Sequence, residues 1–235
     1  MKRQPIRLLI RWGLITTALS ALLFLAAGTS RIGSLRAYLA IFSAWLLVTM
    51  LAVDPRLARE RVHPGNADID DGLRFATGFF FLITLTVAAL SVGRLGPFFN
   101  AAISLRHGAL VVYGLSGSLQ TWAMIVNPFF SPVVRLQTEC GHRVIENGPY
   151  RFMRHPGYFA MLIALPASAI AIGSWLAVIP AVCFVIIVLR RLRTENNFLR
   201  KYLPGYADYA TRVPSTLVLR PKQRAVEQCD SRSEI

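Results

Sequence analysis

Five apolar blocks, each long enough to cross a lipid bilayer, dominate this sequence. A membrane-spanning helix needs about 20 mostly apolar residues. The blocks cover approximately residues 8–28, 37–53, 75–93, 109–130 and 158–189. The last block is too long for one crossing of a hydrocarbon layer about 30 Å thick, and Gly173-Ser174 lies near its middle. We therefore predict an all-α integral membrane protein with six crossings, the last two forming a tight helical hairpin with kinks at Pro166 and Pro180.

The composition agrees with a membrane protein and argues against other classes. Apolar residues make up 54% of the chain and charged residues only 16%, whereas soluble domains average about 25% charged residues. The net charge is +14, but the basic residues lie between apolar blocks and do not alternate with aromatic residues, so we expect no nucleic-acid partner. The cysteines and histidines show neither a disulfide framework nor metal-ligand spacing, and we predict no metal site.

The distribution of lysine and arginine predicts the orientation in the membrane. Of the 26 lysines and arginines, only four fall in the loops on one side of the six predicted crossings, namely Arg31, Arg36, Arg94 and Arg106. Basic residues collect on the cytoplasmic side of membrane proteins, so both termini are expected to be cytoplasmic. The first block is expected to be a transmembrane helix rather than a cleaved signal peptide, because further apolar blocks follow it.

Residues 148–158, GPYRFMRHPGY, stand immediately before the last apolar block. Proline is favoured in the first turn of a helix, so residues 156–159 are expected to present free backbone N–H groups, which attract an anion such as a carboxylate. Tyr150 and Tyr158 offer aromatic faces that can cover a ring or a cation. The same residues also fit a membrane-interface belt, in which Arg151 and Arg154 bind lipid headgroups.

A second polar cluster returns to the same side after the hairpin, at residues 190–209. Glu195 lies there among basic residues, about one helical turn from Arg191. Such an acid can simply form a surface salt bridge. Beside the His-Pro helix start, however, it adds a fixed negative charge to an anion site and aromatic faces. That combination suits a ligand with a carboxylate, a cation and a ring, and S-adenosylmethionine is such a ligand.

At these residues the sequence resembles the isoprenylcysteine carboxyl methyltransferase family and its bacterial relatives. The resemblance is good over about residues 127–220, and its pieces are FFSPVVRLQTECGHRVIENGPYRFMRHPGY, the R-x-x-x-E-x-x-x-L pattern from Arg191 to Leu199, and LPGYADYATRVP. It implies N-terminal transmembrane helices over residues 1–130 and a methyltransferase-like catalytic region with the hairpin and a cytoplasmic helical segment over 131–220. Residues 221–235 are expected to be a flexible tail. The implied location is a bacterial inner (plasma) membrane.

The resemblance also implies an activity and a set of site residues. The expected reaction is transfer of a methyl group from S-adenosyl-L-methionine to a lipophilic or small acceptor, preferably a carboxylate. Arg191 matches the arginine near the methyl acceptor and is the candidate catalytic residue. Glu195 matches the acidic cofactor contact. The other expected cofactor-binding residues are Gln137, His142, Arg143, Val144, Ile145, Tyr150, Arg154, His155, Pro156, Gly157 and Tyr158. Membrane lipids are expected partners, and the acceptor and the oligomeric state stay open.

Two departures from the family pattern keep other functions open. Relatives often carry a second glutamate where this chain has Asn196, and the VPST stretch at 213–216 lacks the arginine or tyrosine often found there. One alternative is an NADPH-dependent membrane reductase of the sterol-reductase type, although such proteins generally show Arg-Asp-Glu where this chain has Arg193-Thr194-Glu195. The other alternative is a non-catalytic membrane scaffold.

Overall fold

Eight α-helices make up the fold in the computed structural model, which describes residues 3–64, 71–96 and 100–217. Six helices are long: α1 (Arg3–Ala27), α2 (Gly33–Ala52), α4 (Asp71–Arg94), α5 (Ile103–Val126), α6 (Pro156–Ile172) and α7 (Val178–Tyr202). Two are short: α3 (Pro55–Val62) and α8 (Tyr206–Arg212). Within the described residues there is no β-strand, only an isolated bridge between Asn100 and Ser174. The predicted all-α fold is confirmed; the predicted tail, 221–235, lies outside the described residues.

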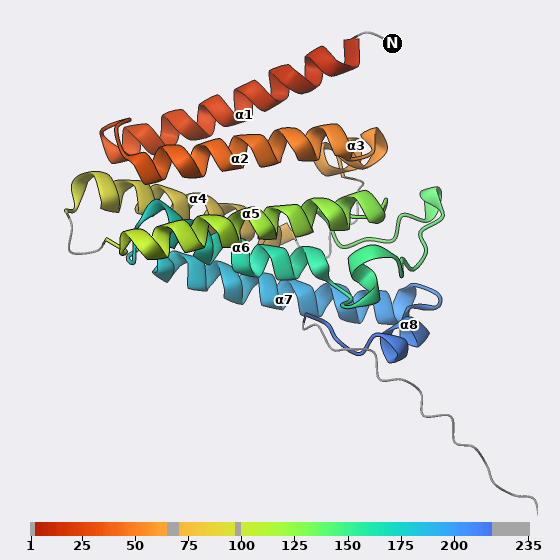
Figure 1. The fold of residues 1–235 in the computed structure, drawn as a ribbon. Coiled ribbons are helices and arrows are strands. Elements are labelled where there is room, and N and C mark those ends of the chain that lie inside the picture. The colour runs from red at the N-terminus through yellow and green to blue at the C-terminus, as the bar shows by residue number, and fades with distance from the viewer. Residues whose placement is uncertain (1–2, 65–70, 97–99, 218–235) are drawn as a thin grey trace, which may run out of the picture.

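The long helices lie roughly side by side, so that the molecule has two ends (Figure 1). The start of α1, helix α3, the start of α6, the end of α7 and α8 lie at one end, which we call the site end. The turns after α1, α4 and α6 lie at the opposite end. The described chain therefore begins and finishes at the same end, as an even number of long helices requires. Its predicted cytoplasmic orientation stays a prediction.

Within the described part of the chain, four helices are long and apolar enough to cross a membrane: Ile6–Ala27, Gly33–Ala52, Gly72–Arg94 and Ile103–Val126. Helix α6 is apolar but has only 17 residues, and α7 changes from apolar to charged along its length. The count of six crossings therefore stays a prediction. The fourth predicted block ends earlier than expected, at Val126, because Asn127 precedes Pro128 and the residue before a proline disfavours helical dihedral angles.

Helices α6 and α7 form the predicted hairpin, which turns at Gly173-Ser174. Gly173 has a φ angle of 120°, which an L side chain rarely adopts. The turn is held from outside by Ala101, whose N–H donates to the Gly173 carbonyl at 2.7 Å. Pro166 lies inside α6, whereas Pro180 lies in the first turn of α7, where proline is tolerated. The hairpin places the charged half of α7 beside the start of α6.

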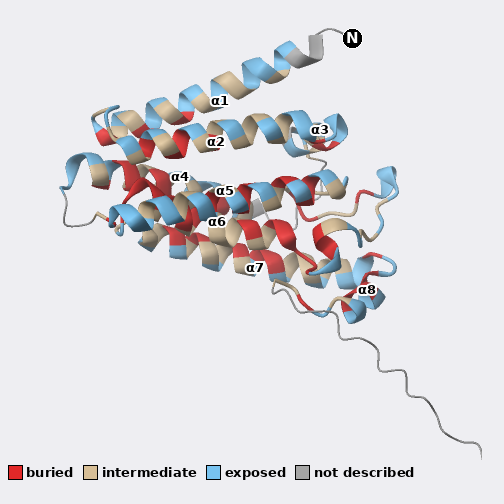
Figure 2. Ribbon diagram, viewed as in Figure 1, coloured by how far each residue is buried: buried red, intermediate tan, exposed pale blue. Residues whose placement is uncertain are grey.

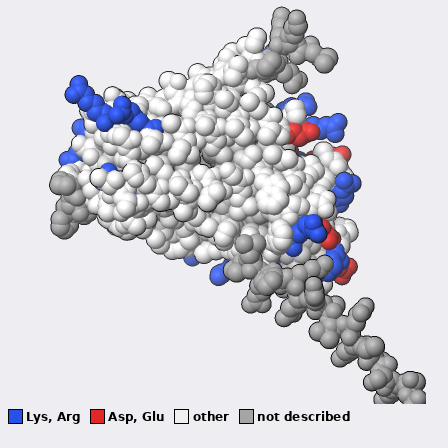
Figure 3. Space-filling view, viewed as in Figure 1, with Lys and Arg blue, Asp and Glu red and all other residues white. Residues whose placement is uncertain are grey.

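The outer surface between the two ends is apolar. Helix α1 is mostly exposed in Figure 2, and its apolar side chains include Leu14 and Leu25, which are 65% and 74% exposed. On the face drawn in Figure 3, arginine and lysine side chains gather at the two ends, acidic side chains gather at the site end, and the surface between is largely uncharged. Water does not cover such a surface favourably, whereas lipid does.

Small residues let the helices approach closely. An added Cβ at Gly93, near the end of α4, would overlap the backbone oxygen of Ala27 at the end of α1. The neighbouring Arg94 donates to the carbonyls of Ala26 at 2.8 Å and Leu25 at 3.0 Å. Both carbonyls belong to the last turn of α1, where no following helical turn supplies donors, and the Leu25 carbonyl also accepts from the Gly28 N–H at 3.2 Å. The pair Gly93-Arg94 thus joins α4 to α1 at the end opposite the site.

We predict that Gly93→Ala lowers the thermal unfolding midpoint of the detergent-purified protein. The added methyl forces backbone apart, and overpacking of this kind costs about 1–3 kcal/mol. Gly78→Ala is the matched control, because Gly78 lies on the same helix with no atom within 4 Å of its added Cβ. Unfolding is followed by far-UV circular dichroism. Equal midpoints for the two variants would contradict the proposed close contact.

Candidate functional site

A cavity of about 200 Å³ lies at the site end. Its walls come from the start of α6, the charged half of α7, helix α8, and the segment between α5 and α6, which contains short 3₁₀ turns at Thr138–Cys140 and Gly148–Arg151. Most residues predicted for the site line it: His142, Arg143, Val144, Ile145, Tyr150, Arg154, His155, Gly157, Tyr158, Arg191 and Glu195. The hairpin therefore brings the two sequence clusters together as expected.

Two predicted residues, Gln137 and Pro156, lie outside the cavity lining. Gln137 is buried, and its side-chain amide donates to the Phe129 carbonyl at 3.0 Å. Pro156 is fully buried in the first turn of α6. Both shape the walls rather than face the space.

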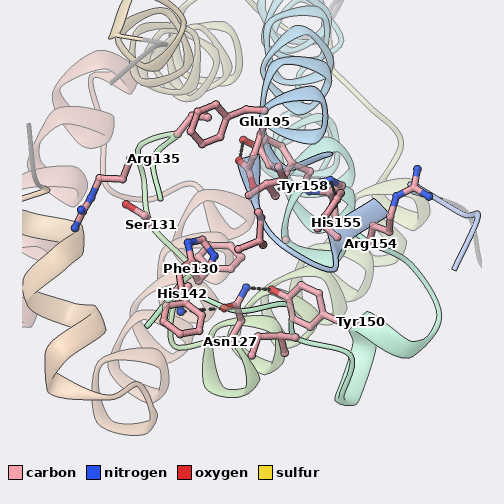
Figure 4. Close-up of a pocket in the computed structure, with 18 of the residues that line it drawn as sticks. Asn127, Phe130, Ser131, Arg135, His142, Tyr150, Arg154, His155, Tyr158 and Glu195 are labelled. Atoms are coloured by element: carbon pink, nitrogen blue, oxygen red, sulfur yellow. Dashed lines mark hydrogen bonds and ion pairs between the residues drawn. The ribbon is translucent and has the colours of Figure 1, made fainter. Parts of the chain in front are cut away.

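Glu195 is the acidic group of the cavity. The Tyr158 hydroxyl donates to Glu195 Oε2 at 2.7 Å, and Oε1 lies 3.8 Å from His155 Nδ1. Burial lowers the pKa of His155 to about 3, so this ring is neutral at physiological pH and makes no ion pair with the carboxylate. Figure 4 shows Glu195, Tyr158 and His155 grouped together on one side of the cavity.

The Nε2 side of the His155 ring contacts helix α8. His155 Nε2 and the Tyr206 hydroxyl lie 3.0 Å apart, and the same hydroxyl donates to Asn196 Oδ1 at 3.2 Å. The sequence analysis assigned no role to Tyr206, although it lies within the LPGYADYATRVP piece that resembles the family. A tyrosine in a loop-like stretch gives no signal of its own. Only the return of α8 under α6 places it against the histidine.

Aromatic and amide groups form the wall across the cavity from Glu195 (Figure 4). The Asn127 side-chain amide donates to the Tyr150 hydroxyl at 3.2 Å. The rings of Phe129 and His142 stack with centroids 4.5 Å apart. Burial lowers the pKa of His142, and its Nδ1 accepts a hydrogen bond from the Gln137 N–H at 3.2 Å. Asn127 and Phe129 were not predicted as site residues, because neither amide nor phenyl groups mark a site in sequence.

An ion pair with a residue much earlier in the chain holds the loop that lines the cavity in place. Arg135 binds Glu60 of α3 in a bidentate manner, with distances of 3.0 and 2.8 Å. The Ser131 hydroxyl also donates to Glu60 at 2.9 Å. Hydrogen bonding to Arg135 lowers the pKa of Glu60. The segment that carries Phe130 and Arg135 is therefore tied to α3, a helix that the apolar-block analysis did not predict.

Two of the three arginines of the predicted site, Arg154 and Arg191, donate to backbone carbonyls. Arg191, buried in α7, donates to the Pro132 carbonyl. The Arg154 guanidinium donates to the carbonyl of Ala210 in α8, and to the Val213 and Pro214 carbonyls and the Thr216 hydroxyl in the segment that follows α8. Arg154 is only 6% exposed, so the interpretation that it binds lipid headgroups is wrong.

The start of α6 offers fewer backbone donors than expected. Proline has no N–H, and the Phe159 N–H already donates to the His155 carbonyl at 3.1 Å, so the prediction of free N–H groups throughout 156–159 is wrong at those two positions. Gly157 has a different role there. An added Cβ would overlap the Phe130 ring, so glycine lets that ring close the cavity against the helix.

Among the residues that the structure describes, no three His, Cys, Asp or Glu side chains lie close enough together to hold a metal ion. The acidic groups near the cavity are separated and individually bonded, Glu60 to Arg135 and Glu195 to Tyr158. The polar groups that line the described cavity include the Glu195 carboxylate, several arginines, two histidines and tyrosine hydroxyls.

Comparison with known proteins finds a similarity over part of this chain. Residues 109–201 match the isoprenylcysteine carboxyl methyltransferase (ICMT) family. A "Probable protein-S-isoprenylcysteine O-methyltransferase" of Oryza sativa is 34% identical over 93 residues, which cover 37% of this chain and 47% of the rice protein. "Protein-S-isoprenylcysteine O-methyltransferase B" of Arabidopsis thaliana is 30% identical over 91 residues, covering 37% and 45%.

A bacterial protein is similar over a shorter stretch. The "Cobalt-zinc-cadmium resistance protein CzcN" of Cupriavidus metallidurans is 32% identical over 73 residues, covering 31% of this chain and 34% of that protein. The chain thus spans about half the length, or less, of the curated relatives that it matches. The matched residues include the start of α6, Arg191 and Glu195, which are the centre of the cavity. Residues 109–201 are therefore similar to the isoprenylcysteine carboxyl methyltransferase family over the part of the chain that forms this centre.

Proposed function

We propose that this protein is an integral-membrane methyltransferase that uses S-adenosyl-L-methionine and methylates a lipophilic or small acceptor. The observation that carries the proposal is the Glu195 carboxylate, fixed by Tyr158 at 2.7 Å in a cavity walled by aromatic rings. A carboxylate fixed by a hydroxyl donor keeps its charge and direction. The similarity of residues 109–201 to the family supports the same reading.

The residues of the cavity fit this cofactor. The carboxylate of Glu195 complements its positive charges, and the faces of Phe129, His142 and Tyr150 suit its adenine ring. When bound, the cofactor supplies an activated methyl group on a sulfonium, so the reaction needs no metal. Gln137, Pro156 and Arg154 are proposed to support these residues from behind, because their polar groups or rings are directed into the protein.

The protein's task in this reaction is alignment. Direct displacement requires that the acceptor atom, the methyl carbon and the sulfur lie in line, and a fixed geometry can supply a large part of the rate. Buried Arg191 and the Pro132 carbonyl to which it donates form a fixed wall where the acceptor would be held. A carboxylate acceptor needs no general base, whereas an amine or a thiol must lose a proton. Closure of Phe130 against Gly157 would exclude water.

The names of the relatives indicate only a broad class of methyl acceptor. Two relatives are named for methyl transfer to an isoprenylcysteine, which favours a carboxylate on an apolar chain. An isoprenoid acid, a phospholipid amine or a small thiol remain alternatives. The location in a bacterial inner membrane with cytoplasmic termini belongs to the same proposal, since the soluble cofactor must reach the site end.

The two rival functions make different demands on the site. A reductase needs room and donors for NADPH, and a scaffold needs no cofactor at all. Asn196, which replaces an acid often found in relatives, was the main support for a scaffold. Its side chain accepts a hydrogen bond from Tyr206, which lines the cavity, so the asparagine has a structural role beside the site. This contact favours the enzyme.

We predict that Glu195→Gln weakens binding of S-adenosylmethionine about ten- to a hundredfold. The amide keeps an acceptor for Tyr158 but removes the charge, and hydrogen bonds to charged groups contribute about 1.5–3 kcal/mol. Isothermal titration of the detergent-purified protein measures the affinity, with NADPH as the comparison ligand. Glu146→Gln is the matched control, because Glu146 is an exposed acid paired with Arg212.

Unchanged affinity in Glu195→Gln would remove the assignment of Glu195. Binding of NADPH, with none of S-adenosylmethionine, would replace the methyltransferase proposal by the reductase. Failure of a folded wild-type protein to bind either ligand would favour the scaffold.

We also predict that Arg154→Lys destabilises the site end rather than removing a ligand contact. A lysine cannot reproduce four simultaneous hydrogen bonds, because its donors share one nitrogen. The thermal unfolding midpoint of the variant should fall by several degrees, consistent with a loss of about 1–3 kcal/mol in the free energy of unfolding. At low temperature, where the variant is still folded, it should keep most of its affinity for the cofactor. Arg151→Lys, at an exposed position three residues earlier, should change neither quantity. A loss of affinity without loss of stability would instead mark Arg154 as a ligand contact.

A further inference from the structure

The His155 ring has two different neighbours, one at each nitrogen. Nε2 lies 3.0 Å from the Tyr206 hydroxyl, and Nδ1 lies 3.8 Å from Glu195 Oε1. A neutral imidazole has one N–H donor and one lone-pair acceptor, and the hydrogen bond at one nitrogen decides the role of the other. The direction of the bond to Tyr206 therefore decides what Nδ1 presents to the cavity.

Asn196 decides that direction. The Tyr206 hydroxyl has a single proton, and it donates this proton to Asn196 Oδ1 at 3.2 Å. Burial raises the pKa of Tyr206, so the hydroxyl keeps its proton at neutral pH. Its oxygen can then only accept a hydrogen bond at His155, which places the imidazole proton on Nε2.

The consequence is that Nδ1 carries a lone pair toward Glu195. Nδ1 and Oε1 are both acceptors, and their separation of 3.8 Å exceeds the range of about 2.7–3.2 Å for a direct hydrogen bond. The other carboxylate oxygen, Oε2, accepts from Tyr158. Two acceptors thus face one point of the cavity wall, where a group with several N–H donors can donate to both.

We propose that Asn196 and Tyr206 are positioning residues that hold His155 in its Nε2–H tautomer, so that His155 Nδ1 and Glu195 Oε1 together form a seat for an ammonium group of the ligand. The identity of that group rests on the proposed function, in which it is the α-amino group of S-adenosylmethionine. The tautomer does not, since it follows from the hydrogen bonds of the ligand-free protein.

An ammonium group fits this seat better than a hydroxyl group. It has three hydrogens and can donate to Nδ1 and Oε1 at once, whereas a hydroxyl has one hydrogen to donate. Its positive charge is attracted by Glu195, and the neutral ring adds no opposing charge. The Glu195 side chain is 27% exposed, so a ligand can reach it from the cavity. The other titratable groups that face His155 are Arg154, Tyr158 and Tyr206.

The same arrangement explains why an asparagine can occupy position 196. The requirement on that side chain is an acceptor within reach of the Tyr206 hydroxyl, and not a negative charge. Both asparagine and an ionised acid meet it. Asn196→Asp should therefore preserve the tautomer, while Asn196→Leu and Tyr206→Phe should release it.

The tautomer can be measured directly in the ligand-free protein. We expect nitrogen-15 NMR of ring-labelled histidine in detergent to show His155 with a protonated Nε2 and an unprotonated Nδ1, the signal being assigned by its loss in His155→Gln. The ring should stay neutral at about pH 5, below the usual histidine pKa of about 6.5. His142 is an internal control, because its Nδ1 accepts from the Gln137 N–H and should not respond to changes at 196 or 206.

The variants test whether positions 196 and 206 control the tautomer of His155. Asn196→Asp should leave the His155 spectrum unchanged, and Tyr206→Phe should give a mixture of tautomers. Asn197→Leu, at the exposed next residue of α7, should behave as wild type. A wild-type His155 protonated at Nδ1 would overturn the proposal, and this measurement needs no variant other than His155→Gln, which assigns the signal.

The ammonium seat is tested by ligand binding. S-adenosylhomocysteine should bind wild type at least about tenfold more tightly than its analogue without the α-amino group, which corresponds to about 1.4 kcal/mol. In Tyr206→Phe this difference should shrink. Equal affinities in wild type would overturn the seat while leaving the methyltransferase proposal in place. No binding of S-adenosylhomocysteine to folded protein would overturn the proposed function and the ammonium assignment together, and the NMR result would still decide the tautomer.

Discussion

The bonds made by Arg154 are the interaction on which the site depends most. Its guanidinium joins the start of α6 to the segment after α8 through the carbonyls of Val213 and Pro214 and the hydroxyl of Thr216. Two backbone bonds, from the N–H groups of Arg154 and His155 to residues 215 and 216, strengthen the same junction. Because α8 is held there, Tyr206 reaches His155. An arginine at the start of α6 thus joins distant segments inside the protein.

The sequence predicted the helices well because a bilayer imposes a length and a polarity on each one. The apolar blocks located α1, α2, α4 and α5, and Gly173 located the turn of the hairpin. Bringing Glu195 beside His155 required only that two consecutive helices be antiparallel. What sequence could not predict are pairings between distant segments, such as Glu60 with Arg135, because neither residue carries a local signal of its partner.

The same distinction separates the predicted site residues from the missed ones. His155, Tyr158 and Glu195 were predicted because their residue types and spacing suggest chemistry, and the cavity contains all three. Asn127 and Tyr206 were missed because amides and tyrosines are common in polar loops. Arg154 was placed in the site, but the direction of its guanidinium depends on a segment some 60 residues away, which no local pattern encodes.

The sequence similarity to the named relatives covers one part of the cavity wall but not the other. The wall that carries His155 and Glu195 lies within residues 109–201, where the similarity to named methyltransferases is found. Helix α3 lies outside that region, yet its Arg61 lies 5.4 Å over the Phe130 ring and lines the cavity. A methyl donor common to a family requires a common pocket, whereas acceptors can differ. Under the proposed function, the part of the cavity bounded by α3 is therefore where a methyl acceptor is most free to differ from that of the plant relatives.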